Sequence, residues 1–178
     1  MHQIKTKLKT FYLFLSLLPL TILAQGQVFN DVEEYKSYVV NEANFEASKI
    51  IIVDADKVNQ LMEYVTEHEM YTFYGIVSNY KVATAAQLSI KSCWGQFLDL
   101  CKRIDDEKSG ITLQHVEDIP YLRDINFSPE KKTVVFIYSF KLGKRHVKHF
   151  IKPIMDEIAK DPTLDYIVLS FDIGNIKM

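Results

Sequence analysis

The chain has 178 residues, of which 48% are hydrophobic and 12% aromatic, and its formal net charge is −2. This composition is typical of a globular protein and excludes an intrinsically disordered one. The first 24 residues hold three Lys and no acidic residue, so the remaining 154 residues carry a net charge of −5. A mildly acidic chain of this length predicts one domain and argues against nucleic acid as a partner.

The N-terminus has the three-part pattern of a secretory signal peptide. A cationic region is followed by an almost wholly apolar stretch, and then by a small residue before a polar exit. These parts are Lys5, Lys7 and Lys9, then residues 11–23, then Ala24. We therefore expect residues 1–24 to be removed on export and residues 25–178 to form a single mature domain, located in a periplasm or outside the cell.

The length of the apolar stretch separates a signal peptide from a membrane anchor. A membrane-spanning helix needs roughly 20 apolar residues, and this stretch is shorter. We therefore expect no stable membrane insertion after cleavage. An uncleaved anchor stays open as the alternative, because Ile22 is larger than the residue usually found three positions before a cleavage site.

Apolar periodicity predicts alternating helices and strands along the mature chain. We expect helices near residues 31–44, 54–68, 92–104 and 144–160, and strands near residues 49–53, 70–77, 80–88, 111–116, 133–140 and 165–172. The segment near residues 83–86 also fits a helix. Strand–helix–strand order predicts parallel pairs joined by right-handed crossovers, one between the strands near residues 50 and 74 and one between the last two strands. The fold class is therefore α/β, a single layered domain whose mixed, partly parallel sheet is flanked by helices.

The last strand–helix–strand unit carries a family resemblance. The segment Lys152–Ala159, with Pro153 near its start, resembles the second half of the active-site helix of thioredoxin-like proteins, and the resemblance covers residues 133–172. Arg145 and Lys148 stand where that family keeps its two cysteines. The resemblance therefore implies a thioredoxin-like unit without dithiol chemistry.

Five basic residues surround Gly143 at the junction between the strand near 133–140 and the following helix. We call this set the basic turn: Lys141, Lys144, Arg145, Lys148 and Lys152. The start of a helix offers unpaired N–H groups and a partial positive charge, which together attract anions. The basic turn therefore predicts a site for a small anion, and a solvated charged face is the alternative.

The cysteines and histidines give weaker signals. Cys93 and Cys101 lie eight residues apart, which on one helix is roughly 12 Å, beyond the roughly 7 Å limit for a disulfide. We therefore expect two buried, inert thiols, with redox chemistry as the alternative. His146 and His149 lie three residues apart, but a metal site needs at least three ligands, so we expect no metal site and no cofactor.

The sequence thus favours a non-enzymatic, exported α/β protein that binds an unidentified protein partner or a small anionic ligand on a thioredoxin-like scaffold. Two other classes stay open. One is a redox or disulfide-handling protein that uses Cys93 and Cys101, and the other is an enzyme whose site is assembled from distant residues.

Overall fold

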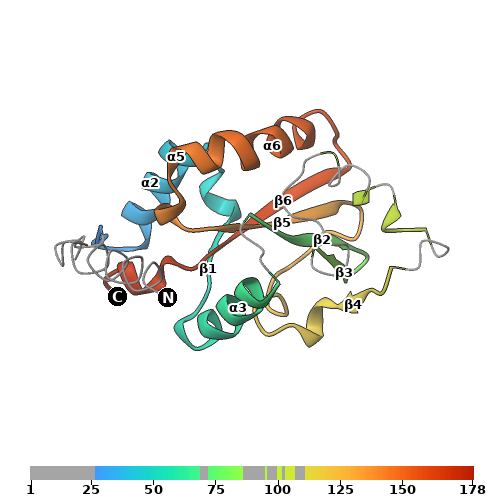
Figure 1. Cartoon of the computed structure of the whole chain (residues 1–178), viewed down its shortest axis with the longest axis horizontal. Helices are drawn as coiled ribbons and strands as arrows, with labels where there is room; N and C mark the ends of the chain where they lie inside the picture. The colour runs from blue at the N-terminus through green and yellow to red at the C-terminus, as the bar shows by residue number, and fades with distance from the viewer. Residues whose placement is uncertain (1–26, 69–71, 86–94, 96–99, 102, 107–110) are drawn as a thin grey trace, which may run out of the picture.

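Six strands form one mixed sheet in the computed structural model, and helices cover both of its faces (Figure 1). The structure describes residues 27–68, 72–85, 95, 100–101, 103–106 and 111–178. The strands are β1 (Ile50–Ile52), β2 (Phe73–Ser78), β3 (Lys81–Thr84), β4 (Gln114–His115), β5 (Lys132–Tyr138) and β6 (Leu164–Ser170). Their order across the sheet is β1-β6-β5-β2-β3-β4. The predicted α/β class, with its mixed and partly parallel sheet, is confirmed.

Helices α2 (Val32–Ala43), α5 (Gly143–His146) and α6 (Lys152–Ile158) lie on one face of the sheet, and α3 (Ala55–Glu67) lies on the other (Figure 1). Within the described ranges, none of the helices is both long and apolar enough to cross a membrane. The side chains of β5 and β6 are buried almost throughout, as expected for strands covered on both faces.

The parallel half of the sheet consists of β1, β6 and β5. Residue Tyr138 at the end of β5 pairs with Ser170 at the end of β6, and Ile52 of β1 pairs with the same Ser170. All three carboxyl ends therefore lie at one edge of the sheet. The predicted parallel pairing of the last two strands, with a helix between them, is confirmed.

The predicted parallel pair near residues 50 and 74 is wrong. After β1 the chain crosses by α3 to β2, which pairs antiparallel with β5 and does not touch β1. Apolar runs identify both segments as strands, but nothing local in them specifies which neighbour each strand takes. The hairpin of β2 and β3 then turns at Asn79 and Tyr80, both of which have positive φ.

Two predicted elements differ from the structure. The strand near residues 111–116 is reduced to the two residues of β4, because a 3₁₀ turn (Val116–Asp118) begins directly after it. The helix near residues 144–160 is divided by a π-helical turn (Val147–Ile151). Pro153 explains the division, since its ring lacks an N–H and excludes the carbonyl four residues earlier. The N–H of Lys152 accordingly reaches back five residues to the carbonyl of Val147.

Candidate functional site

A buried carboxylate at the end of β6 organises this end of the sheet. Asp172 is 3% exposed. Its Oδ2 accepts a hydrogen bond from the Tyr35 hydroxyl at 2.7 Å and from the Phe140 N–H at 2.9 Å, and its Oδ1 accepts one from the Ser139 hydroxyl at 2.7 Å. The Ser170 hydroxyl also bonds to the Tyr35 hydroxyl. The same Ser170 hydroxyl donates to Oδ2 of Asp172 at 3.4 Å. Burying a charge is unfavourable unless it is hydrogen-bonded, and here four donors meet the carboxylate.

The sequence explains how these groups come together. The parallel pair ends level at Tyr138 of β5 and Ser170 of β6, so Ser139, directly after β5, and Asp172, two residues after β6, meet in a hydrogen bond. Tyr35 comes from α2, whose buried face it shares with Val39 and Ala43. Burial and the neighbouring Asp172 carboxylate raise the pKa of Tyr35 well above its ordinary value, so its hydroxyl stays a hydrogen-bond donor.

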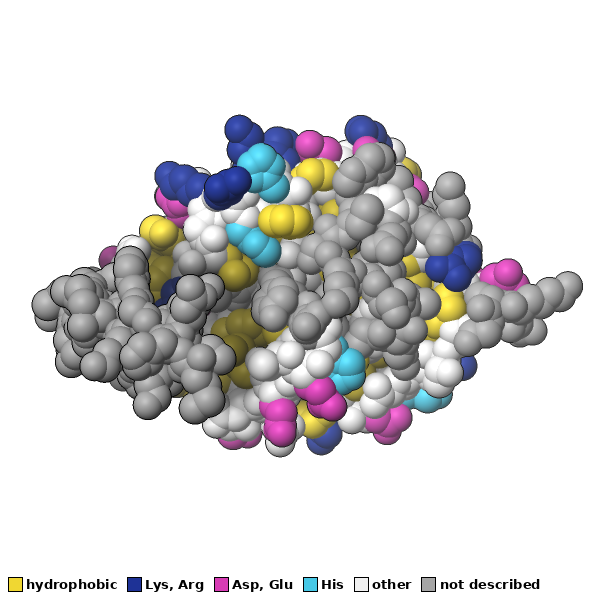
Figure 2. Space-filling view, in the orientation of Figure 1, with side chains coloured by type: hydrophobic (Ala, Val, Ile, Leu, Met, Phe, Trp, Pro, Cys, Tyr) yellow, Lys and Arg dark blue, Asp and Glu magenta, His cyan; other side chains and the backbone are white. Residues whose placement is uncertain are grey.

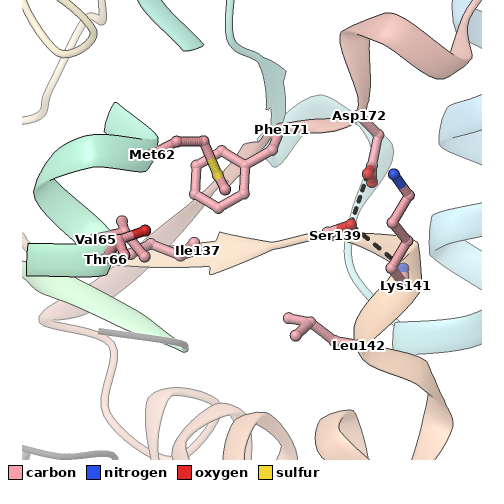
Figure 3. Close-up of a pocket in the computed structure, with 9 residues that line it drawn as sticks. All are labelled: Met62, Val65, Thr66, Ile137, Ser139, Lys141, Leu142, Phe171 and Asp172. Atoms are coloured by element: carbon pink, nitrogen blue, oxygen red, sulfur yellow. Dashed lines mark hydrogen bonds between the residues drawn. The ribbon is translucent and has the colours of Figure 1, made fainter. Parts of the chain in front are cut away.

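A pocket of about 340 Å³ opens next to this network. We call it the β5–β6 pocket. Its lining residues come from α3, from the ends of β5 and β6 and from the turn after β5: Met62, Val65, Thr66, Ile137, Ser139, Lys141, Leu142, Phe171 and Asp172. Figure 3 shows the polar side chains of Ser139, Lys141 and Asp172 at one end, and Met62, Val65 and Phe171 at the other. The charged groups therefore lie at one end, and the other end is mainly apolar apart from the hydroxyl of Thr66.

The position of the β5–β6 pocket in the sheet is one that α/β folds commonly use for ligands. The chain leaves β5 toward α5 on one face and leaves β1 toward α3 on the opposite face (Figure 1). Where crossovers diverge in this way, a crevice forms outside the carboxyl ends of the strands, and ligands bind there. A volume of about 340 Å³ also falls within the range of small-molecule sites.

Lys141 supplies the positive charge at the polar end of this pocket. Its side chain is exposed, and its ammonium group lies 5.9 Å from the centre of the Phe140 ring. Within the described part of the chain the ammonium group makes no ion pair. Its charge is therefore available to a ligand.

The backbone of the turn offers an anion little beyond that side chain. The N–H of Phe140 bonds to Asp172, and the N–H of Lys141 bonds to the Ser139 hydroxyl at 3.3 Å. The N–H of Leu142 bonds to the Ser139 carbonyl at 3.0 Å, and the N–H of Gly143 bonds to the Phe140 carbonyl. The N–H groups from residue 140 to residue 143 are thus already in use, and an anion in the pocket would meet the Lys141 side chain.

The other members of the basic turn lie apart from this pocket. Lys144, Lys148 and Lys152 line a second hollow, of about 360 Å³, between the end of α2 and the π-helical turn with α6; we call it the α2–α6 hollow. Figure 2 shows Lys and Arg side chains gathered at the upper margin, over α5 and α6. The structure thus divides the five basic residues between two hollows and the exposed Arg145.

Acidic residues already neutralise much of the charge in the α2–α6 hollow. Lys144 pairs with Glu42 at 3.0 Å, and Lys152 pairs with Asp156 at 2.6 Å. Lys148 is exposed and forms no ion pair with any residue that the structure describes. Each hollow therefore keeps one Lys that makes no ion pair with the described residues, Lys148 here and Lys141 in the β5–β6 pocket. The β5–β6 pocket differs in that apolar side chains form more of its lining.

Cys101 is buried, and burial raises the pKa of its thiol to about 12. The group is a neutral thiol at physiological pH and a poor nucleophile. Its backbone carbonyl accepts a hydrogen bond from the Lys132 ammonium at 2.6 Å. Cys93 lies outside the described residues, so the predicted helical placement of the two thiols is seen only at Cys101.

The two histidines of the helix differ in their surroundings. The Nε2 atom of His146 lies 2.8 Å from the Oγ1 atom of the buried Thr72, and the His146 ring packs on Phe150 at 5.0 Å. His149 is exposed. No cluster of three or more His, Cys, Asp or Glu side chains suited to a metal ion occurs in the described ranges.

Sequence reasoning found Lys141 but missed its neighbours Ser139, Asp172 and Tyr35. A signal for the first two was present, since Ser139 directly follows the apolar run of β5 and Asp172 lies two residues after the end of β6. Tyr35 gave no local signal, because it lies on the apolar face of a helix and meets Asp172 across 137 positions of sequence. Comparisons of the chain with models of protein families, with curated proteins and with solved structures found no match.

Proposed function

We propose that this chain is a non-enzymatic, exported α/β protein that binds a small organic anion in the β5–β6 pocket. The observation that carries the proposal is the Lys141 ammonium group, which makes no ion pair with the described residues, at the polar end of an otherwise mainly apolar pocket. An apolar pocket with a few polar groups that fix orientation is the usual form of a small-molecule site.

The state of Asp172 supports binding over catalysis. A carboxylate that acts as a general base must reach the proton it removes. Both oxygens of Asp172 instead accept hydrogen bonds from within the protein, and the side chain is 3% exposed. We therefore assign Asp172 to the structure of the pocket wall.

The redox alternative receives less support. A redox cysteine needs a lowered pKa and access to solvent, and Cys101 has a raised pKa and is buried. Counting reactive thiols in the native and the unfolded protein, with and without reductant, tests whether a cysteine of this chain is redox-active. A thiol that reacts rapidly at neutral pH in the native protein would restore the redox function.

The scaffold and the compartment are parts of the same proposal. The parallel unit of β5, helix and β6, with Pro153 within the helix, is compatible with a thioredoxin-like scaffold in which Arg145 and Lys148 replace the cysteines. Export rests on the pattern of residues 1–24, which lie outside the described residues. Mass spectrometry of the protein recovered from culture medium or periplasm should find Gln25 as the first residue, whereas a retained Met1 would contradict cleavage.

Thermal unfolding with a panel of small carboxylates, sulfonates and phosphates tests the binding function. A ligand at 100 times its Kd stabilises the fold by about 2.7 kcal/mol. For a domain of this size each kcal/mol raises the Tm by about 2 to 4 °C, so we expect a rise of about 5 to 11 °C with at least one anion.

Two charge-matched variants locate the site in the same experiment. Lys141→Gln should reduce the rise in Tm, and Lys148→Gln, which removes the same charge from the α2–α6 hollow, should leave it unchanged. If no anion raises the Tm, the binding function is wrong. If only Lys148→Gln reduces the rise, the site lies in the α2–α6 hollow instead.

A further inference from the structure

The β5–β6 pocket separates charge from apolar surface along its length. Among the described lining residues the cationic group is the Lys141 ammonium, which lies at the same end as the Asp172 carboxylate, and the far end is formed by Met62, Val65 and Phe171 with the hydroxyl of Thr66 (Figure 3). A ligand that satisfies both ends must carry an anionic head and an apolar tail. Simple inorganic anions satisfy only one end.

The donors at the polar end limit the charge of the head group. The N–H groups from Phe140 to Gly143 are used within the protein, so a head group meets one ammonium. Phosphate groups are usually held by several donors, such as a row of backbone N–H groups or an Arg. The carboxylate of Asp172 in the pocket wall also repels a second negative charge. Both features favour a head group with one negative charge.

The apolar end is formed by adaptable side chains. Met62 is 41% exposed, which is unusual for a large apolar residue, and it lies on the face of α3 that borders the pocket. Methionine is flexible and polarizable, so it adapts to irregular apolar surfaces. A flexible aliphatic tail would cover Met62 and the half-buried Phe171 and remove both from water.

We propose that the ligand of the β5–β6 pocket is an amphiphilic monoanion, an aliphatic carboxylate whose head meets Lys141 and whose tail lies against Met62 and Phe171. This inference rests on the proposed binding function and specifies its ligand class. Each buried methylene contributes about 0.8 kcal/mol, or about fourfold in affinity. Affinity should therefore rise steeply from butyrate to hexanoate to octanoate.

Methionine methyl groups provide a separate reporter for each hollow. Met62 lines the β5–β6 pocket and Met155 lines the α2–α6 hollow. In protein labelled with methyl-¹³C methionine, NMR titration with octanoate should shift the Met62 signal and leave the Met155 signal in place. Assignment follows from Met62→Leu and Met155→Leu, each of which removes one signal.

The variants test the contact with the head group. Lys141→Gln should weaken octanoate binding about tenfold, equivalent to about 1.4 kcal/mol, whereas Lys148→Gln should leave it unchanged. In both variants the dependence on tail length should persist, because the apolar end is intact. Equal weakening by both substitutions would overturn the assigned contact, since it would indicate a general effect of net charge.

The probes distinguish failure of this inference from failure of the binding function. If octanol, or inorganic phosphate, shifts Met62 as strongly as octanoate does at equal concentration, the pocket binds ligands but the amphiphilic monoanion is wrong. If octyl phosphate binds more tightly than octanoate, the inference that the head group carries a single negative charge is wrong. If no probe moves Met62, the binding function itself falls, and the inference falls with it.

Discussion

Removal of the Asp172 carboxylate should destabilise the fold through the donors that it leaves behind. In Asp172→Ala the hydroxyl of Tyr35 loses its acceptor inside the protein, where Tyr35 is 0% exposed. A buried donor without a partner costs about 1 to 3 kcal/mol. The hydroxyl of Ser170 lies beside Tyr35 as a substitute acceptor, so we expect the lower half of that range.

The donors Ser139 and Phe140 add a smaller amount. Ser139 and Phe140 are half-buried, so water can partly replace the hydrogen bonds that they donate to Asp172. With about 1 kcal/mol for this pair, Asp172→Ala should lower the free energy of unfolding by about 2 to 3 kcal/mol. That is a large share of the 5 to 15 kcal/mol that typical domains possess.

Asp172→Asn should lower stability by less, about 1 to 2 kcal/mol. Its amide oxygen still accepts from Tyr35 and Phe140, and its amide group faces the Ser139 hydroxyl, which can accept as well as donate. The charge is lost, and hydrogen bonds to a charged acceptor are roughly twice as strong as neutral ones. The order wild type, Asn, Ala is therefore expected from the network.

Urea unfolding followed by circular dichroism measures these differences, with Asp118→Ala as the matched control because Asp118 is exposed. Tyr35→Phe completes a double-mutant cycle, since it should destabilise the wild type more than it destabilises Asp172→Ala. If Asp172→Ala unfolds within about 0.5 kcal/mol of the control, or if the two substitutions are additive, the network does not hold this end of the sheet.

Three further predictions follow from individual groups. The pKa of Cys101 is raised to about 12 by burial, so its thiol should react with a thiol reagent at pH 8 only after unfolding, and fast labelling of the native protein would contradict its burial. In Gly75→Ala the new Cβ would lie 2.4 Å from the carbonyl oxygen of Ala83, so we expect a loss of about 2 to 3 kcal/mol in urea unfolding, and an unchanged midpoint would show that β2 can shift. Burial raises the pKa of Tyr35 and Tyr74, so their contribution to stability is complete below the unfolded pKa of about 10 and is lost as pH rises above it. The free energy of unfolding, measured from pH 8 to 11.5, should therefore fall above pH 10. A flat profile would refute this.

The strands that were easiest to predict are those buried on both faces. The apolar, β-branched runs of β5 and β6 need no tertiary information, because no other element accommodates them at that length. The start of α2 was also predictable, since Asp31 accepts a hydrogen bond from the N–H of Glu34 at 2.8 Å as a helix cap should.

The failures have a common physical origin in long-range pairing. The position of β2 beside β5 depends on where α3 crosses the sheet, and no local sequence pattern in either strand specifies this pairing. Local chemistry also misleads at Asp54, which stands at the cap position of α3 but forms an ion pair with Lys57 at 3.3 Å in place of a side-chain cap. Elements are thus set by short-range patterns, and their neighbours by the packing of the whole chain.

The buried network and the candidate ligand contact share one turn, and this links stability to binding. The hydrogen bonds of Asp172 to Ser139 and Phe140 fix the start of the turn that carries Lys141. Asp172→Asn should therefore weaken both folding and octanoate binding, because the backbone that carries the Lys141 side chain is then held less firmly. Lys141→Gln should weaken binding alone, since its ammonium makes no ion pair with the described residues. If Asp172→Asn lowers stability and leaves the Met62 response to octanoate unchanged, the network supports the fold without shaping the pocket.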